Sequence, residues 1–230
     1  MALILSIETS TSVCSVALHD SGNLVGVVEL HQDNVHSQKL MLLIEDLMNR
    51  SGFKSENLKA VAVSSGPGSY TGLRIGVSVA KGFAFAHDIP LIAVDTLLAL
   101  AKRVVPLVNS SGKIVPMLDA RRMEVYTAVY DYQLNTIEKL SPRVIEEGNP
   151  FLDYLNQGQV YFLGDGVEKL RSLLEHPSSV LLKWGPSALT LGELAFDKYQ
   201  REEFEDLAYF EPNYLKDFRV ISSKKNLLLS

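Results

Sequence analysis

The chain has 230 residues, of which 47% are hydrophobic and 21% charged, a composition typical of a globular protein with one large or two small domains. Its formal net charge of -5 argues against a protein that holds nucleic acid by itself, because clustered Lys and Arg supply most of that affinity. The single cysteine, Cys14, excludes an internal disulfide, and no stretch approaches the roughly 20 apolar residues of a membrane span, so we expect a cytoplasmic protein without membrane association.

The first hundred residues predict one compact α/β domain. Three short β-rich runs separated by turn residues predict an antiparallel meander, and helices and strands alternate after it. The expected strands are 3–7, 12–19, 24–30, 59–64 and 91–94, and the expected helices are 34–50, about 69–87 and 96–104. We therefore place the first domain at residues 1–105.

A strand, a tight turn and a helix follow one another without a gap over residues 61–87. Gly66, Pro67 and Gly68 end the strand, and Ser69 or Thr71 is the expected N-cap of the helix. A glycine-rich turn that opens a helix points free backbone amides outward and could hold an anion. A tight strand-to-helix turn explains the same residues, and no P-loop lysine follows them.

The two helices of this half carry unusual faces. Gly72, Gly76 and Ala80 form one stripe of small residues, which predicts that another helix approaches closely. The apolar residues of helix 34–50 cover an arc wider than a surface helix needs, so part of that face is free for a partner. The residues of this arc are Leu40, Met41, Leu43, Ile44, Leu47 and Met48.

A segment rich in Pro, Asn, Ser and Gly at 106–112 marks the start of a second domain, residues 106–230. Asp119, Arg121 and Glu124 follow its first strand, where α/β folds often place ligand residues, although an interdomain ion-pair network explains them equally well. The expected strands are 114–118, 125–132, 136–145 and 160–163, the expected helices are 150–157, 166–175 and 186–200, and an irregular tail follows from 201.

Four motifs carry a family resemblance that spans nearly the whole chain. They are LSIETS near the start, SGPGSYTGLRIG at 65–76, DARRMEVYTAVY at 119–130 and PNYL at 212–215. Together they closely resemble the TsaB (YeaZ) family of bacterial threonylcarbamoyladenosine biosynthesis. The resemblance implies an α/β fold of two ribonuclease H-like lobes, each a mixed sheet with helices, as in the acetate kinase, Hsp70 and actin superfold.

The resemblance also implies a role without catalysis. A TsaB-like subunit binds and activates a longer paralogue, TsaD, and with the small ATPase TsaE the assembly transfers a threonylcarbamoyl group to adenosine in tRNA. We therefore expect a heterodimer with a TsaD-like protein, a homodimer when alone, tRNA contact only through the complex, and no cofactor. The partner surface is expected on the first two helices, from the apolar arc and the small-residue stripe.

Two departures from related families support this reading. TsaD-like proteins carry a His-x-x-x-His pair for a metal, but the matching positions here are Thr96 and Leu100, so we expect neither a metal site nor catalytic residues. Nucleotide-binding relatives carry Asp-x-Gly-Thr/Ser at the first hairpin, where this chain has Glu8 and Thr9. These two residues, with Gly66, Gly68 and Ser69, are the remaining candidates for cofactor binding. A glycoprotease-like metallopeptidase and a small-molecule kinase of the same superfold are the alternative functions.

Overall fold

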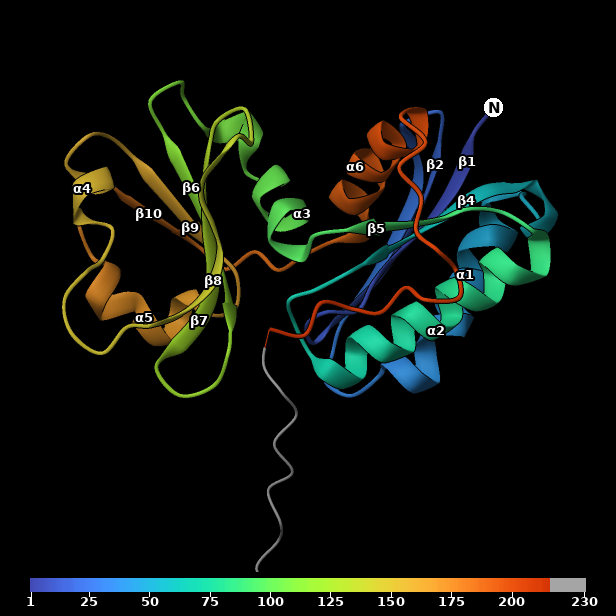
Figure 1. The fold of residues 1–230 in the computed structure, drawn as a ribbon, viewed down its shortest axis with the longest axis horizontal. Helices are drawn as coiled ribbons and strands as arrows, with labels where there is room; N and C mark the ends of the chain where they lie inside the picture. Colours follow the sequence, from blue (N-terminus) through green and yellow to red (C-terminus); the bar gives the residue numbers. More distant parts are fainter. Residues whose placement is uncertain (216–230) are drawn as a thin grey trace, which may run out of the picture.

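The computed structural model describes residues 1–215, which form two lobes, each built on a five-stranded mixed sheet (Figure 1). In the first sheet the order is β3-β2-β1-β4-β5, with an antiparallel meander followed by two parallel strands. Its strands are β1 (Leu3–Glu8), β2 (Val13–Asp20), β3 (Asn23–His31), β4 (Leu58–Ser64) and β5 (Leu91–Val94). The predicted meander is therefore confirmed.

The second sheet repeats this arrangement, with the order β10-β9-β6-β7-β8. Strands β6 to β8 are antiparallel neighbours, β9 pairs with β6 in parallel, and β10 pairs with β9 in parallel. Its strands are β6 (Lys113–Asp119), β7 (Glu124–Asp131), β8 (Thr136–Val144), β9 (Val160–Leu163) and β10 (Ser179–Leu182). The sequence did not predict β10, which has only four residues and no alternating pattern. Read from the β8 edge, the order is β8-β7-β6-β9-β10, which corresponds strand for strand to β3-β2-β1-β4-β5 of the first sheet. The two lobes therefore share one topology.

Strand alternation divides the first sheet into two apolar faces. Leu3, Leu5 and Ile7 point toward α1 (His36–Ser51) and α2 (Tyr70–His87), whereas Ile4 packs on the opposite side with Leu191 of α6 (Ala188–Gln200). Figure 1 shows α1 and α2 side by side on one face of this sheet. Among residues 1–215, none of the helices combines the length and apolar character needed to cross a bilayer.

Each sheet is covered on one face by a helix from the other half of the sequence. Helix α3 (Thr96–Lys102) packs Leu97 and Leu100 against the second sheet, and α6 lies against the first (Figure 1). The two helices meet between the lobes, where Thr190 donates to the carbonyl of Ala99 at 2.7 Å. A division at 105/106 therefore misplaces both helices, because each apolar face is completed by a segment remote in sequence. The remaining helices, α4 (Leu152–Leu155) and α5 (Val167–Leu174), cover the outer face of the second sheet.

The residues after α6 run back along the first lobe. Glu205 donates to the Leu91 carbonyl on edge strand β5 at 2.9 Å, and Asn213 donates to the Ser65 carbonyl at 2.7 Å. The ring of Tyr214 then packs against that of Tyr70 in a tilted arrangement, with 4.8 Å between the ring centroids. Up to residue 215 the tail predicted from residue 201 is irregular, with turns and a single bridge of Glu205 to Leu91, and its remainder, 216–230, lies outside the described residues.

Candidate functional site

The glycine-rich turn before α2 closes on the chain itself. Gly66 has a φ of +101°, a conformation that glycine adopts without strain. Ser69 is the N-cap, as predicted, and its hydroxyl accepts from Gly72 N at 3.2 Å. The backbone N–H of Ser69 donates to the Ser10 carbonyl at 2.6 Å, and a Cβ on Gly68 would collide with the same carbonyl. The Ser69 and Gly72 amides that could hold an anion are therefore already engaged within the chain.

The small-residue stripe of α2 faces the β1–β2 loop rather than another helix. A Cβ on Gly72 would overlap the Thr9 carbonyl, and one on Gly76 would overlap the Thr9 hydroxyl, which donates to the Gly72 carbonyl at 2.8 Å. Ala80 is also fully buried. The prediction of a close approach is correct, but its partner is a loop of the same chain, so Gly72, Gly76 and Ala80 are not exposed to a second protein.

Glu8 ends β1 in a fully buried position. One of its carboxylate oxygens accepts from the backbone N–H of Ser10 at 2.6 Å. Burial raises the pKa of the Glu8 carboxyl, and hydrogen bonds from Ser10 and Ser64 offset this only in part. Thr9 is buried as well, so both candidate cofactor residues at this hairpin serve the packing between β1 and α2.

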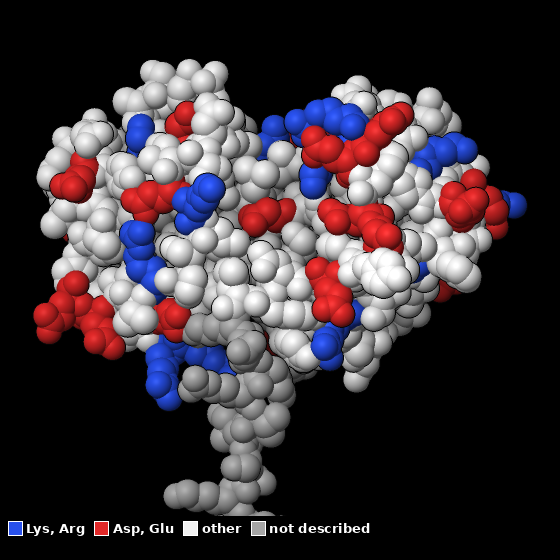
Figure 2. All heavy atoms as spheres, viewed as in Figure 1, with Lys and Arg blue, Asp and Glu red and all other residues white. Residues whose placement is uncertain are grey.

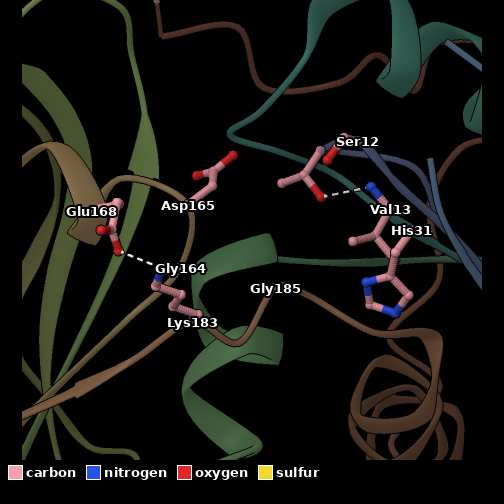
Figure 3. Close-up of a pocket in the computed structure, with 9 residues that line it drawn as sticks. Ser12, Val13, His31, Gly164, Asp165, Glu168, Lys183 and Gly185 are labelled. Carbon is pink, nitrogen blue, oxygen red and sulfur yellow. Dashed lines mark hydrogen bonds and ion pairs between the residues drawn. The ribbon is translucent and has the colours of Figure 1, made fainter. Parts of the chain in front are cut away.

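A cleft of about 250 Å³ lies between the two lobes (Figure 3). Ser12 of the β1–β2 loop lines one side, and Asp165, Glu168 and Lys183 line the other. Lys183 pairs with Glu168 at 3.0 Å, and hydrogen bonds from Arg171 and Lys183 lower the pKa of that carboxyl. The lining therefore has no unpaired lysine that could bind a phosphate group, and Asp165 adds a carboxylate. This cleft suits a neutral or cationic polar group better than a nucleotide phosphate.

The sequence did not single out the cleft residues Asp165, Glu168 and Lys183, although a usable signal exists. Asp165 lies two residues after the parallel strand β9, and Lys183 directly follows the parallel strand β10. Ligand residues of α/β folds gather at the carboxyl ends of such strands. The same rule drew attention to Asp119, which is the last residue of β6. Because β10 was not recognised, Lys183 could not be placed at this edge.

Asp119 belongs to a network within the second lobe. Its carboxylate pairs with Lys169 at 2.5 Å, and Lys169 also donates to the Glu124 carbonyl at 2.5 Å. The backbone N–H of Asp119 donates to Asp165, whose pKa is raised because the surrounding chain restricts hydration of the carboxyl. Arg121 donates only its backbone N–H, to Asp119 at 2.7 Å. Asp119 and Glu124 thus fasten the β6–β7 turn to α5.

The positions that match the metal-binding histidines of TsaD-like proteins lie inside the fold. Thr96 and Leu100 are both fully buried, and Leu100 packs in the apolar cluster between α3 and the second sheet. Within residues 1–215, no group of three or more His, Cys, Asp or Glu side chains is placed to share a metal ion.

The apolar arc of α1 divides into a buried and an exposed part. Leu40, Ile44, Leu47 and Met48 are at most 6% exposed and pack in the core of the first lobe, so their assignment to a partner surface is wrong. Leu43 is half-buried, whereas Met41 is 52% exposed.

Other apolar side chains of α1 and α2 are also exposed or half-buried. Leu42 follows Met41 on α1 and is 53% exposed, and Phe85 near the end of α2 is 81% exposed. Half-buried Ile75, Val79 and Phe83 lie along α2. We call this set, Met41, Leu42, Leu43, Ile75, Val79, Phe83 and Phe85, the α1–α2 surface.

Comparison with known proteins agrees with the motifs and the fold. Residues 23–224 match the family model of TsaD, described as tRNA N6-adenosine threonylcarbamoyltransferase. The chain is 30% identical to the tRNA threonylcarbamoyladenosine biosynthesis protein TsaB of Escherichia coli (strain K12), over 93% of this chain and 94% of that protein. It is 33% identical to TsaB of Bacillus subtilis (strain 168) over 75% of each chain.

Among solved structures, YeaZ from Pseudomonas aeruginosa superposes with a TM-score of 0.77 at 27% identity, covering 94% of this chain and all of that one. The two sheets of identical strand order and this superposition confirm the expected two-lobed fold of the acetate kinase, Hsp70 and actin type. From its motifs, its relatives and its fold, the chain belongs to the TsaB (YeaZ) family.

Proposed function

We propose that this protein is a non-catalytic subunit that binds and activates a TsaD-like paralogue, which transfers a threonylcarbamoyl group to adenosine in tRNA. The observation that carries the proposal is the α1–α2 surface. Met41, Leu42 and Phe85 are more than half exposed on two neighbouring helices of a chain whose other large apolar residues mostly pack inside. Large apolar side chains left exposed on neighbouring helices are typical of a protein interface.

The kind of partner follows from the shared fold. The chain matches the TsaD family model over residues 23–224, so a TsaD-like protein offers helices equivalent to α1 and α2. The same surface on two copies of this chain gives a two-fold homodimer, and the paralogue replaces one copy to give the heterodimer. A TsaE-like ATPase joins the larger assembly, which acts in the cytoplasm.

Three features of the side chains and backbone support a subunit without catalysis of its own. Threonine and leucine stand where TsaD-like proteins carry two imidazoles, and both are enclosed in the core. The turn before α2 binds the Ser10 carbonyl instead of a phosphate. These features support a role in which the catalytic groups come from the paralogue.

Met41→Glu tests the partner surface. A carboxylate buried in a dry interface loses its hydration without gaining a partner, so we expect the affinity for the paralogue to fall at least 100-fold. Size-exclusion chromatography with light scattering measures assembly, and tRNA modification by the mixture measures activation. Met48→Glu is unsuitable, because Met48 is 6% exposed and a charge there unfolds the lobe.

Ile137→Glu is the matched control, since Ile137 is 41% exposed on β8 of the other lobe. It is expected to assemble with the paralogue and to support modification as the parent protein does. If Met41→Glu assembles normally while keeping the thermal midpoint of the parent, the partner surface lies elsewhere. If the paralogue alone modified tRNA as fast as the mixture of the two proteins does, an activating role would be contradicted.

A further inference from the structure

The tip of the β6–β7 hairpin carries two arginines that the proposed function does not use. Arg121 and Arg122 are both exposed, and both have positive φ, +68° and +50°. Hydrogen bonds fix the turn: Ala120 donates to the Glu124 carbonyl at 3.0 Å, and Glu124 donates to the Arg121 carbonyl at 3.2 Å. The two guanidinium groups therefore project from a backbone of defined shape.

Neither guanidinium has an ion pair or a side-chain hydrogen bond among the described residues. The neighbouring carboxylate of Asp119 is already paired with Lys169. By contrast, the guanidinium group of every other arginine in residues 1–215 makes a hydrogen bond or an ion pair. These arginines are Arg50, Arg74, Arg103, Arg143, Arg171 and Arg201. In a chain of net charge -5, the hairpin tip thus presents two positive charges that the described chain does not neutralise.

The tip lies at the edge where the two lobes meet. Asp119 at its base is bonded to Asp165, which lines the interlobe cleft. Ala120 belongs to the apolar cluster on which Leu215 packs, and the adjacent Tyr214 accepts a hydrogen bond from Arg74 at 3.2 Å. Figure 1 shows this turn at the lower edge of its lobe, and Figure 2, in the same view, shows basic atoms gathered there.

The chemistry of the tip suits phosphate groups on an extended polymer. Guanidinium groups bind phosphate oxygens in pairs of parallel hydrogen bonds, more specifically than an ammonium group does. A hairpin tip does not enclose a small ligand, but it can lie against a backbone that passes over it.

We propose that Arg121 and Arg122 contact backbone phosphates of the tRNA bound by the assembled complex. This inference rests on the proposed function. The acidic chain alone has too few cations to hold RNA, so the tRNA must be bound by the assembled complex. In the assembly the two arginines add affinity without reading sequence, since phosphate contacts position a nucleic acid rather than specify it. They therefore make this subunit a part of the tRNA-binding surface.

The test replaces the pair with Arg121→Asn and Arg122→Gly in the full-length chain assembled with its paralogue. Asparagine and glycine accept positive φ, so both charges are removed while the turn is kept. We expect the affinity of the complex for unmodified tRNA to fall about tenfold at physiological salt. We also expect the slope of log K against log salt to become less steep by about 1.5 to 2, as the loss of two phosphate contacts requires.

The control removes two other exposed cations, by Lys59→Ala with Lys139→Ala, and should leave the affinity and the salt slope almost unchanged. If parent and arginine variant bind tRNA with equal affinity and slope, the proposal is overturned. It is also overturned if the variant no longer assembles, because the arginines then contact the protein partner. Failure of the parent chain itself to assemble would instead contradict the proposed function.

Discussion

Glu8 shows how a position can keep its chemical group while its environment changes its use. The carboxylate ends β1 at the place where the motif of nucleotide-binding relatives carries an aspartate, yet it is enclosed and bonded to Ser10. The resemblance could identify the position, but the burial of the side chain could not be predicted from it. Burial depends on Thr9 and Ser10 folding against the distant Gly68 and Gly72.

Glu8→Gln should stabilise the protein at neutral and alkaline pH. The folded-state pKa of Glu8 is raised, so its contribution to stability is fully present below about pH 4.5 and is lost as the pH rises through the folded-state pKa. Glutamine keeps an acceptor for Ser10 N–H and carries no charge. We therefore expect a higher free energy of unfolding than that of the parent at pH 8, measured by urea unfolding.

The gain from Glu8→Gln should shrink as the pH falls, because the raised pKa lets the folded parent carboxyl take up a proton before an exposed glutamate does. Glu8→Ala is the comparison, and it should destabilise the protein at pH 8 and at lower pH alike, since the Ser10 N–H loses its acceptor. A gain that is independent of pH, or a loss at pH 8, would show that the ionised carboxylate is well accommodated.

At the scale of single elements, α2 offers two glycines with opposite roles. A Cβ at Gly76 would collide with the Thr9 hydroxyl, whereas a Cβ at Gly82 meets nothing within 4 Å. Gly76→Ala should therefore cost about 1 to 3 kcal/mol through overpacking. Gly82→Ala should add about 0.5 to 1 kcal/mol, because alanine favours the helix. Thermal unfolding of both variants checks the pair, and equal effects would contradict the packing described for Gly76.

The elements that the sequence predicted well have local signals. The strand, turn and helix around Gly66 and Ser69 were predicted because glycine, proline and a capping hydroxyl act within a few residues. The residues that cover one face of a helix are, by contrast, distant in sequence. Met41 and Met48 share one apolar arc, yet one is exposed and the other buried, because the strands and α2 decide which side of α1 is covered.

At the scale of the whole molecule, the exchange of α3 and α6 makes the two lobes depend on each other. Residues 1–105 alone lack Leu191 and Ala195, which cover one face of the first sheet, and residues 106–230 alone lack α3. An uncovered sheet face costs several kcal/mol of a total stability of about 5 to 15 kcal/mol. We expect neither fragment to unfold cooperatively when circular dichroism is followed on heating.

A chain that joins residues 1–94 to 185–215 through a Gly/Ser linker keeps α6 and is expected to recover a cooperative transition. Should fragment 1–105 unfold as sharply as this joined chain, α6 would be dispensable for the first sheet. The sequence could not predict this dependence, because the Pro- and Gly-rich segment at 106–112 has the composition of a domain boundary.

The return of α6 to the first sheet also governs the order of events during synthesis. Strand β5 ends at Val94, and α6 begins only at Ala188. At a translation rate of about 5 to 20 residues per second, the ribosome needs roughly 5 to 20 s to make the segment between them. During that interval the side of the sheet that carries Ile4 and Ile92 has no cover, and the nascent chain is then a substrate for chaperones that bind exposed apolar strands.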